Sequence, residues 1–159
     1  MLAKQLTTLE RIQDCDFCVN GMEAVDKVIR VYEDCVFGQE TPEPGRLRRL
    51  APIQLLMLDF QMPKLTGVQV VGAVRKYLKE RNMSLKEIGI ELQEPKIVFV
   101  TAFLSVGFRK HIAELGILNA YEKPLQLAQL KKILAFDAIV EDRDSAGVSD
   151  NNKASRESN

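Results

Sequence analysis

Short apolar runs that alternate with helical patterns are the feature that most constrains this fold. Three runs read as strands, at residues 53–58, 97–100 and 119–122. Between them, apolar residues recur at the three- and four-residue spacing of helices packed on one face. Strands that alternate with helices predict a parallel sheet joined by right-handed crossovers, with helices on both of its faces. We therefore expect a doubly wound α/β domain.

Each of the three runs leads into a different polar side chain. Asp59 follows the first run, Thr101 follows the second and Lys123 follows the third. The carboxyl ends of parallel strands share one edge of the sheet, and open α/β sheets bind their ligands there. We expect a carboxylate, a hydroxyl and an amine to converge at this edge.

These three groups suit phosphoryl transfer. A carboxylate can attack a phosphoryl group and form an acyl phosphate. The charge on the transferring oxygens needs a fixed positive partner and hydrogen-bond donors, which an ammonium and a hydroxyl supply. Taken singly, each residue is better explained as ordinary strand-end chemistry, so the hypothesis depends on their joint order and spacing.

That order resembles the receiver domain of two-component response regulators. The likeness extends over about residues 1–136, and it includes Met62-Pro63 and Gly67 in the turn after Asp59, Ala102 after Thr101, and Lys123-Pro124. The resemblance implies a flavodoxin-like fold with five parallel strands in the order 2-1-3-4-5. It also implies a signalling module and not an enzyme in its own right.

The resemblance assigns a role to each site residue. Asp59 would become the 4-aspartylphosphate, Lys123 would be its ion-pair partner, and Thr101 and Tyr121 would form the switch that senses the phosphoryl group. Asp59 and the backbone carbonyl of Gln61 would be metal ligands, since receivers use Mg²⁺. The phosphoryl donor would be a histidine kinase or a histidine phosphotransfer domain, and the chain could be the receiver of a hybrid sensor kinase.

One departure from the family is serious. Receivers hold Mg²⁺ with an acidic pair at the end of their first strand, and here an amphipathic helix is predicted from residue 2 to residue 12, where Leu2, Leu6, Leu9 and Ile12 recur. The first strand is therefore missing, and we expect weak Mg²⁺ binding. A fragment of a longer reading frame is favoured over a degenerate receiver. The alternative function is a pseudo-receiver that binds partners without phosphorylation.

The remaining segments complete the predicted organisation. A short strand is expected at residues 16–19, and Asn20 is expected to cap the helix that follows it. Residues 33–52 and 79–95 read as exposed, polar insertions, and the Arg cluster at residues 46–49 reads as a solvated face rather than a phosphate site. Residues 1–136 form the predicted receiver, and residues 137–159 a disordered polar tail.

Composition excludes several other classes. Lys plus Arg and Asp plus Glu both number 22, so no net field recruits nucleic acid or an anionic membrane. No apolar run is long enough to span a bilayer, and three cysteines fit a reducing compartment, so a cytoplasmic location is expected. Cys15 and Cys18 lack the second pair that a zinc site needs. No glycine-rich phosphate loop supports a flavodoxin-like nucleotide-binding enzyme.

Overall fold

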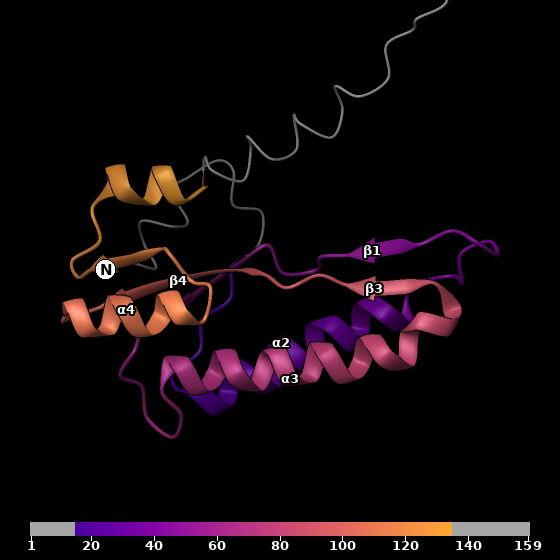
Figure 1. The fold of residues 1–159 in the computed structure, drawn as a ribbon, viewed down its shortest axis with the longest axis horizontal. Coiled ribbons are helices and arrows are strands. Elements are labelled where there is room, and N and C mark those ends of the chain that lie inside the picture. Colours follow the sequence, from indigo (N-terminus) through magenta and orange to yellow (C-terminus); the bar gives the residue numbers. More distant parts are fainter. Residues whose placement is uncertain (1–14, 135–159) are drawn as a thin grey trace, which may run out of the picture. The chain divides into compact units, whose positions relative to one another are not determined.

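The computed structural model describes residues 15–134 (Figure 1). The predicted helix at residues 2–12 and the predicted tail at residues 137–159 lie outside this range. The chain divides into two compact units, Met1–Pro124 and Leu125–Asn159. In the second unit, the described residues 127–134 are helical, and the first unit holds the strands and the other helices.

Three parallel strands form the sheet that positions the site. They are β2 (Leu55–Leu58), β4 (Lys96–Thr101) and β5 (Ala120–Glu122), in the order β2-β4-β5. Leu58 lies opposite Phe99, and Thr101 lies opposite Glu122. All three predicted runs are therefore strands, and their carboxyl ends share one edge as expected.

Three helices cover one face of these strands (Figure 1). They are α2 (Gly21–Phe37), α3 (Gly67–Leu85) and α4 (Val106–Glu114), and a short 3-10 turn, η1 (Lys86–Ile88), follows α3. Asn20 caps α2 as predicted, because its side-chain oxygen accepts a hydrogen bond from the Glu23 amide at 3.0 Å. The parallel strands, the helices and the strand order agree with a flavodoxin-like α/β fold.

The core lies between β4 and these helices. Phe99 is fully buried, and its ring meets that of Phe108 edge to face at 5.4 Å. The valines of α3 pack on the same strand, so the middle strand is buried along nearly its whole length. A buried β4 holds its carboxyl end, and with it Thr101, in a fixed position.

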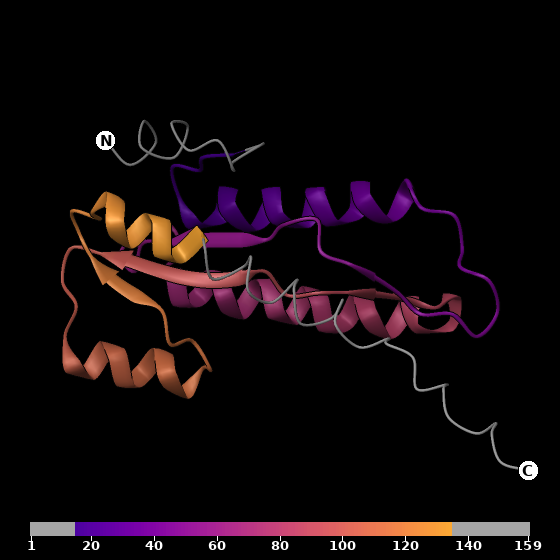
Figure 2. The same ribbon diagram turned by 90° about the horizontal axis from the view of Figure 1, so that it is seen from above.

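Residues 33–52 and 79–95, which were predicted as exposed, polar insertions, contain helical and strand segments, and the proline-containing stretch between α2 and β1 is a loop. Helix α2 continues to Phe37 and α3 to Leu85, while β1 (Arg48–Leu50) pairs in parallel with β3 (Ile90–Leu92). Figure 2 shows α2 and α3 running alongside the strands toward this added pair. Both additions lengthen the same end of the domain, at the amino-terminal side of β2 and β4.

The extension has its own core and a closed edge. Tyr32, Leu50 and Leu92 are buried in it, and the Tyr32 hydroxyl donates to the Gln93 carbonyl at 2.5 Å. The side-chain amide of Asn82 donates to the Leu92 carbonyl at 3.0 Å and accepts from the Leu92 amide at 2.7 Å. The Asn82 side chain thus takes up the hydrogen-bonding groups of Leu92 at the outer edge of β3, as a further strand would.

The strand expected at residues 16–19 does not form. This segment is extended or bent and belongs to no ladder, although Cys18 packs against the core. No strand among residues 15–134 lies between it and β2, so its backbone has no described partner to pair with. An apolar strand pattern needs such a partner, because pairing supplies most of the stability of a strand.

Candidate functional site

Asp59 stands directly after β2, at the start of a tight turn. The Gly67 amide closes this turn by donating to the Phe60 carbonyl at 3.0 Å. A Cβ atom at Gly67 would lie 2.4 Å from the Asp59 carbonyl oxygen and 2.7 Å from Cε1 of Phe99. Only glycine allows this close approach, so Gly67 fixes the backbone on which the Asp59 carboxylate stands.

Lys123 meets Asp59 from the end of β5. The Lys123 ammonium lies 2.5 Å from Oδ2 of Asp59. The backbone amide of Lys123 donates to the Thr101 carbonyl at 2.8 Å, which joins the ends of β5 and β4. The Lys123–Pro124 bond is cis. The predicted convergence of the amine with the carboxylate is therefore confirmed.

Thr101 ends the middle strand, between the strands that carry the other two groups. It is only 3% exposed, and among the described residues it is the polar side chain that lies buried with the apolar core. Tyr121 lies in β5 opposite Val100 and is half-buried. The structure thus places both predicted switch residues at or next to this edge, while their roles remain predictions.

Gln61 contacts Asp59 through its amide. The Gln61 N–H donates to Oδ1 of Asp59 at 3.3 Å. Each carboxylate oxygen therefore has a donor, Gln61 on one and Lys123 on the other. The sequence prediction did not include this contact, although aspartates at turns commonly accept a hydrogen bond from the amide two residues further along the chain.

The ion pair remains open to solvent. The side chains of Lys123 and Asp59 are 45% and 27% exposed. An exposed pair is screened by water and adds little to stability. Solvent access also means that a phosphoryl donor can approach the carboxylate, so the pair suits chemistry better than it suits structural support.

These residues do not fit a magnesium site. Mg²⁺ takes one or two carboxylates together with waters and phosphate oxygens. Asp59 is a single carboxylate whose charge Lys123 already balances. Within the part of the chain that the structure describes, no cluster of three or more His, Cys, Asp or Glu side chains could hold a metal ion. The predicted ligand role of the Gln61 carbonyl has no support from this donor set.

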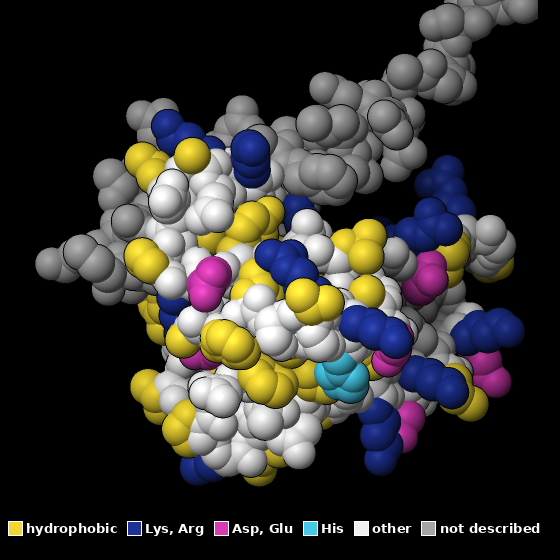
Figure 3. Space-filling model, turned by 60° about the vertical axis from the view of Figure 1, so that its left-hand side comes forward, with side chains coloured by type: hydrophobic (Ala, Val, Ile, Leu, Met, Phe, Trp, Pro, Cys, Tyr) yellow, Lys and Arg dark blue, Asp and Glu magenta, His cyan; other side chains and the backbone are white. Residues whose placement is uncertain are grey.

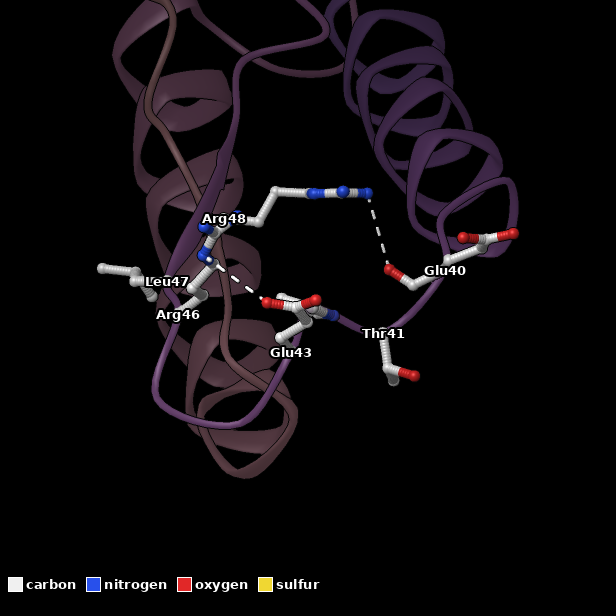
Figure 4. Close-up of a pocket in the computed structure, with 7 residues that line it drawn as sticks. Glu40, Thr41, Glu43, Arg46, Leu47 and Arg48 are labelled. Carbon is white, nitrogen blue, oxygen red and sulfur yellow. Dashed lines mark hydrogen bonds and ion pairs between the residues drawn. The ribbon is translucent and has the colours of Figure 1, made fainter.

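A hollow of about 410 Å³ lies at the other end of the unit, in the loop between α2 and β1 (Figure 4). Its two arginines already have partners within the loop. Arg48 donates to the Gln39 side chain at 2.8 Å, and Arg46 lies 3.8 Å from Glu43. Because these guanidinium groups have partners, the Arg cluster is better described as a solvated face than as a phosphate site.

The histidine and cysteines form no second site. Figure 3 shows the single histidine, His111, on a face where apolar and charged side chains are interspersed. The three cysteines are free, and burial raises the pKa of the Cys15 and Cys18 thiols. A raised pKa disfavours the reactive thiolate, which leaves the Asp59 edge as the candidate site.

Comparisons with known proteins agree with this geometry. No family model matches the chain. It is 31% identical over 119 residues to two-component response regulator 24 of Arabidopsis thaliana, a match that takes in 75% of this chain and 62% of that protein. It is 26% identical over 132 residues to histidine kinase 1 of the same plant, which covers 79% of this chain but 10% of that protein. The chain thus spans less than two thirds of each relative.

A solved structure shares the fold. It is the signal receiver domain of a putative Luxo repressor protein from Vibrio parahaemolyticus, with a TM-score of 0.57 and 20% sequence identity over 91% of this chain and 87% of that one. Among the helices of residues 15–134, none is long and apolar enough to cross a membrane. Both curated relatives carry names from two-component signalling.

Proposed function

Since the chain is a receiver domain of the two-component type, we propose that Asp59 accepts a phosphoryl group from a phosphohistidine and that the chain thereby relays a signal. The observation that carries this proposal is the Lys123 ammonium, 2.5 Å from Oδ2 of Asp59. The donor would be a histidine kinase or a histidine phosphotransfer domain in the cytoplasm. The family generally uses Mg²⁺, but the described residues do not supply a site for it.

The chemical step follows from the groups at the edge. A carboxylate oxygen of Asp59 attacks the phosphorus atom, an oxygen–phosphorus bond forms, and the phosphorus–nitrogen bond of the donor breaks. The imidazole leaves with the bonding electron pair and takes a proton from solvent. Lys123 then faces the phosphoryl oxygens and balances their charge. The product is an acyl phosphate on Asp59.

Thr101 would convert this modification into a change of shape. Its hydroxyl can donate to a phosphoryl oxygen. To make this bond, the Thr101 side chain would move toward the phosphoryl group. Because the residue is almost fully buried at the end of β4, its movement would disturb the packing around it and free space beside Tyr121. Phosphorylation would then shift the equilibrium between two arrangements of this sheet edge, which is how charge-changing switches generally act.

A second candidate function has its own observation. The Asp59 carboxylate already has a hydrogen-bond donor on each oxygen, and among the described residues no cluster of three or more His, Cys, Asp or Glu side chains could hold a metal ion. This arrangement favours a pseudo-receiver, in which the Asp59 carboxylate stays paired with Lys123 and partners bind without phosphorylation. The two candidates differ in one measurable property, the transfer of a phosphoryl group to Asp59.

Intact-mass measurement of the full chain separates them. We expect slow uptake of one phosphoryl group from phosphoramidate or from a phosphorylated phosphotransfer domain, with little dependence on Mg²⁺. Asp59→Asn should abolish uptake, while Asp26→Asn, a change of an exposed aspartate on α2, should leave it unchanged. No uptake from either donor would contradict phosphoryl transfer to Asp59 and leave the pseudo-receiver as the candidate function. Fast uptake that requires Mg²⁺ would show that the full chain does bind this ion.

A further inference from the structure

The outer edge of β2 differs from the other strand edges of the described sheets. An open strand edge can pair with another chain, and charged residues or side-chain caps usually prevent this. The outer strand β1 carries two exposed arginines, β3 is capped by Asn82, and β5 ends in the exposed Glu122. The sequence of β2, Leu55–Leu58, contains neither a charge nor a proline. Among these strands, β2 therefore has the unprotected edge.

The β2–β4 ladder shows which backbone groups face this edge. The Lys96 amide donates to the Gln54 carbonyl at 2.9 Å, so the backbone of Gln54 points toward β4. Successive residues of a strand direct their N–H and C=O groups to opposite sides. Leu56 therefore bonds to β4 as well, whereas Leu55 and Met57 point outward. Within residues 15–134, no other strand pairs with β2, so these outward groups have no strand partner there.

The side chains of β2 are also less buried than those of its neighbour. Leu55, Leu56 and Met57 are half-buried, whereas residues 97–101 of β4 are all buried. A strand added to β2 would cover part of this apolar surface and bond to the outward backbone groups. Main-chain hydrogen bonds supply the affinity when a peptide extends a sheet in this way. An extended peptide segment is therefore the ligand that matches both features of the edge.

The position of α2 limits what can pair with β2. Figure 2 shows α2 beyond β2, on the side away from β4. A single strand widens the sheet by only ~4.8 Å, whereas a second copy paired edge to edge would bring its own α2 against this helix. In the chain itself, residues 2–12 have the apolar spacing of a helix and residues 137–159 are polar, so neither pattern favours a strand. A segment of another protein is the remaining occupant.

We propose that the outer edge of β2 is a peptide-binding site that takes one extended, uncharged segment of a partner protein as an added strand. The N–H and C=O groups of Leu55 and Met57 bind its backbone, and the half-buried side chains of β2 contact its apolar residues. The segment is uncharged because residues 51–58 contain no charged side chain that could pair with it. The inference goes beyond the proposed function, and its test needs no phosphoryl donor.

Hydrogen exchange of the full chain, followed by NMR, is the test. The probe is a peptide that copies residues 96–101, with two lysines added for solubility, because β2 already accepts this sequence on its other edge. In the free chain, we expect the Met57 amide to exchange at least tenfold faster than the Leu56 amide. Saturating peptide should slow exchange at Met57 at least tenfold and leave Leu56 unchanged. A control peptide with proline in place of both valines should change neither.

A pair of variants at position 57 tests the same hydrogen bond. Met57→Pro removes only the outward N–H, because this group is not part of the β2–β4 ladder and edge strands tolerate proline. It should raise the dissociation constant of the peptide at least tenfold, whereas Met57→Val, which keeps the N–H, should leave the constant nearly unchanged. Circular dichroism verifies that both variants are folded, and the exchange rates of the parent chain decide the question if Met57→Pro is not.

Three results would overturn the proposal. A Met57 amide that is already protected in the free chain would show that the edge is paired, by a second copy if the protection rises with concentration and by the chain itself if it does not. A Met57 amide that exchanges fast and that the peptide does not slow would show that the edge binds no added strand. Faster exchange at Leu56 on addition of peptide would show that the peptide displaces β4 instead of binding to the outer edge.

Discussion

Replacement of Asn82 by leucine tests whether the extension is an integral part of the fold. Asn82 makes two hydrogen bonds to the backbone of Leu92, one as donor at 3.0 Å and one as acceptor at 2.7 Å. Leu92 is only 3% exposed. In Asn82→Leu the side chain keeps nearly the same size, but a buried N–H and a buried C=O both lose their partners.

The expected loss of stability follows from these two groups. A buried polar group without a partner costs about 1–3 kcal/mol, so with two such groups the variant should be about 2–6 kcal/mol less stable than the parent. The free energy of unfolding, from urea denaturation of the full chain, measures this loss. Hydrogen exchange should also quicken at the Leu92 amide, because its protection depends on the Asn82 carbonyl.

The control is Ser84→Ala, an exposed change two residues further along α3. It should alter the free energy of unfolding by no more than about 0.5 kcal/mol. If Asn82→Leu costs as little as this control, the two hydrogen bonds do not hold the extension in place, because water or a local rearrangement must then replace both. The segments around β1 and β3 would in that case be only loosely attached to the rest of the fold.

Three further predictions concern the site and the core. Gly67→Ala should cost about 1–3 kcal/mol in thermal unfolding, as overpacking does, and should slow phosphoryl uptake by Asp59, whereas Gly72→Ala, where a Cβ meets nothing within 4 Å, should be neutral or stabilising. Burial raises the pKa of Tyr32 from 10.0 to about 12. The neutral hydroxyl therefore contributes fully to stability below pH ~10, and this contribution is lost as the pH rises through ~12. Urea midpoints that stay constant over this range would contradict this prediction. Lys123→Met should change stability by less than about 1 kcal/mol, since the pair is exposed, yet lower the initial rate of phosphoryl uptake at least tenfold, and an unchanged rate would remove Lys123 from the mechanism.

The strand ends at the site could be predicted because their information is local. Each of the three runs is apolar enough to be a buried strand, and the residue that follows each run lies at the carboxyl edge by the geometry of parallel sheets. Asp59 and Lys123 met as expected, although 64 positions separate them in the chain. The turn residues agreed with the same arrangement, since Gly67 stands where the chain has no room for a side chain.

The extension could not be predicted because its information is not local. The sequence of β1 is Arg48-Arg49-Leu50, with one buried residue, and its strand conformation depends on pairing with β3 about 40 residues later. The polar residues at the end of α3 looked like a solvated extension. Asn82 instead directs its amide to Leu92, and a pattern of apolar and polar residues does not predict such a contact.

The strand predicted at residues 16–19 shows the opposite error. Its local pattern favours a strand, but the described sheet offers its backbone no neighbour to pair with. Local propensity in strands is weak compared with pairing and burial. A partner strand is therefore part of the evidence that a strand prediction needs.

Chemical trapping of the phosphorylated residue tests most directly whether Asp59 is the phosphoryl acceptor. Borohydride reduces the acyl phosphate of an aspartate to homoserine, which peptide mass spectrometry locates in the sequence. After reaction of the full chain with a phosphorylated phosphotransfer domain, we expect homoserine at position 59 and an unmodified Asp59→Asn variant. Homoserine at another aspartate, a stable phosphate on His111, or no modification under any condition would contradict the assignment of Asp59 as the acceptor.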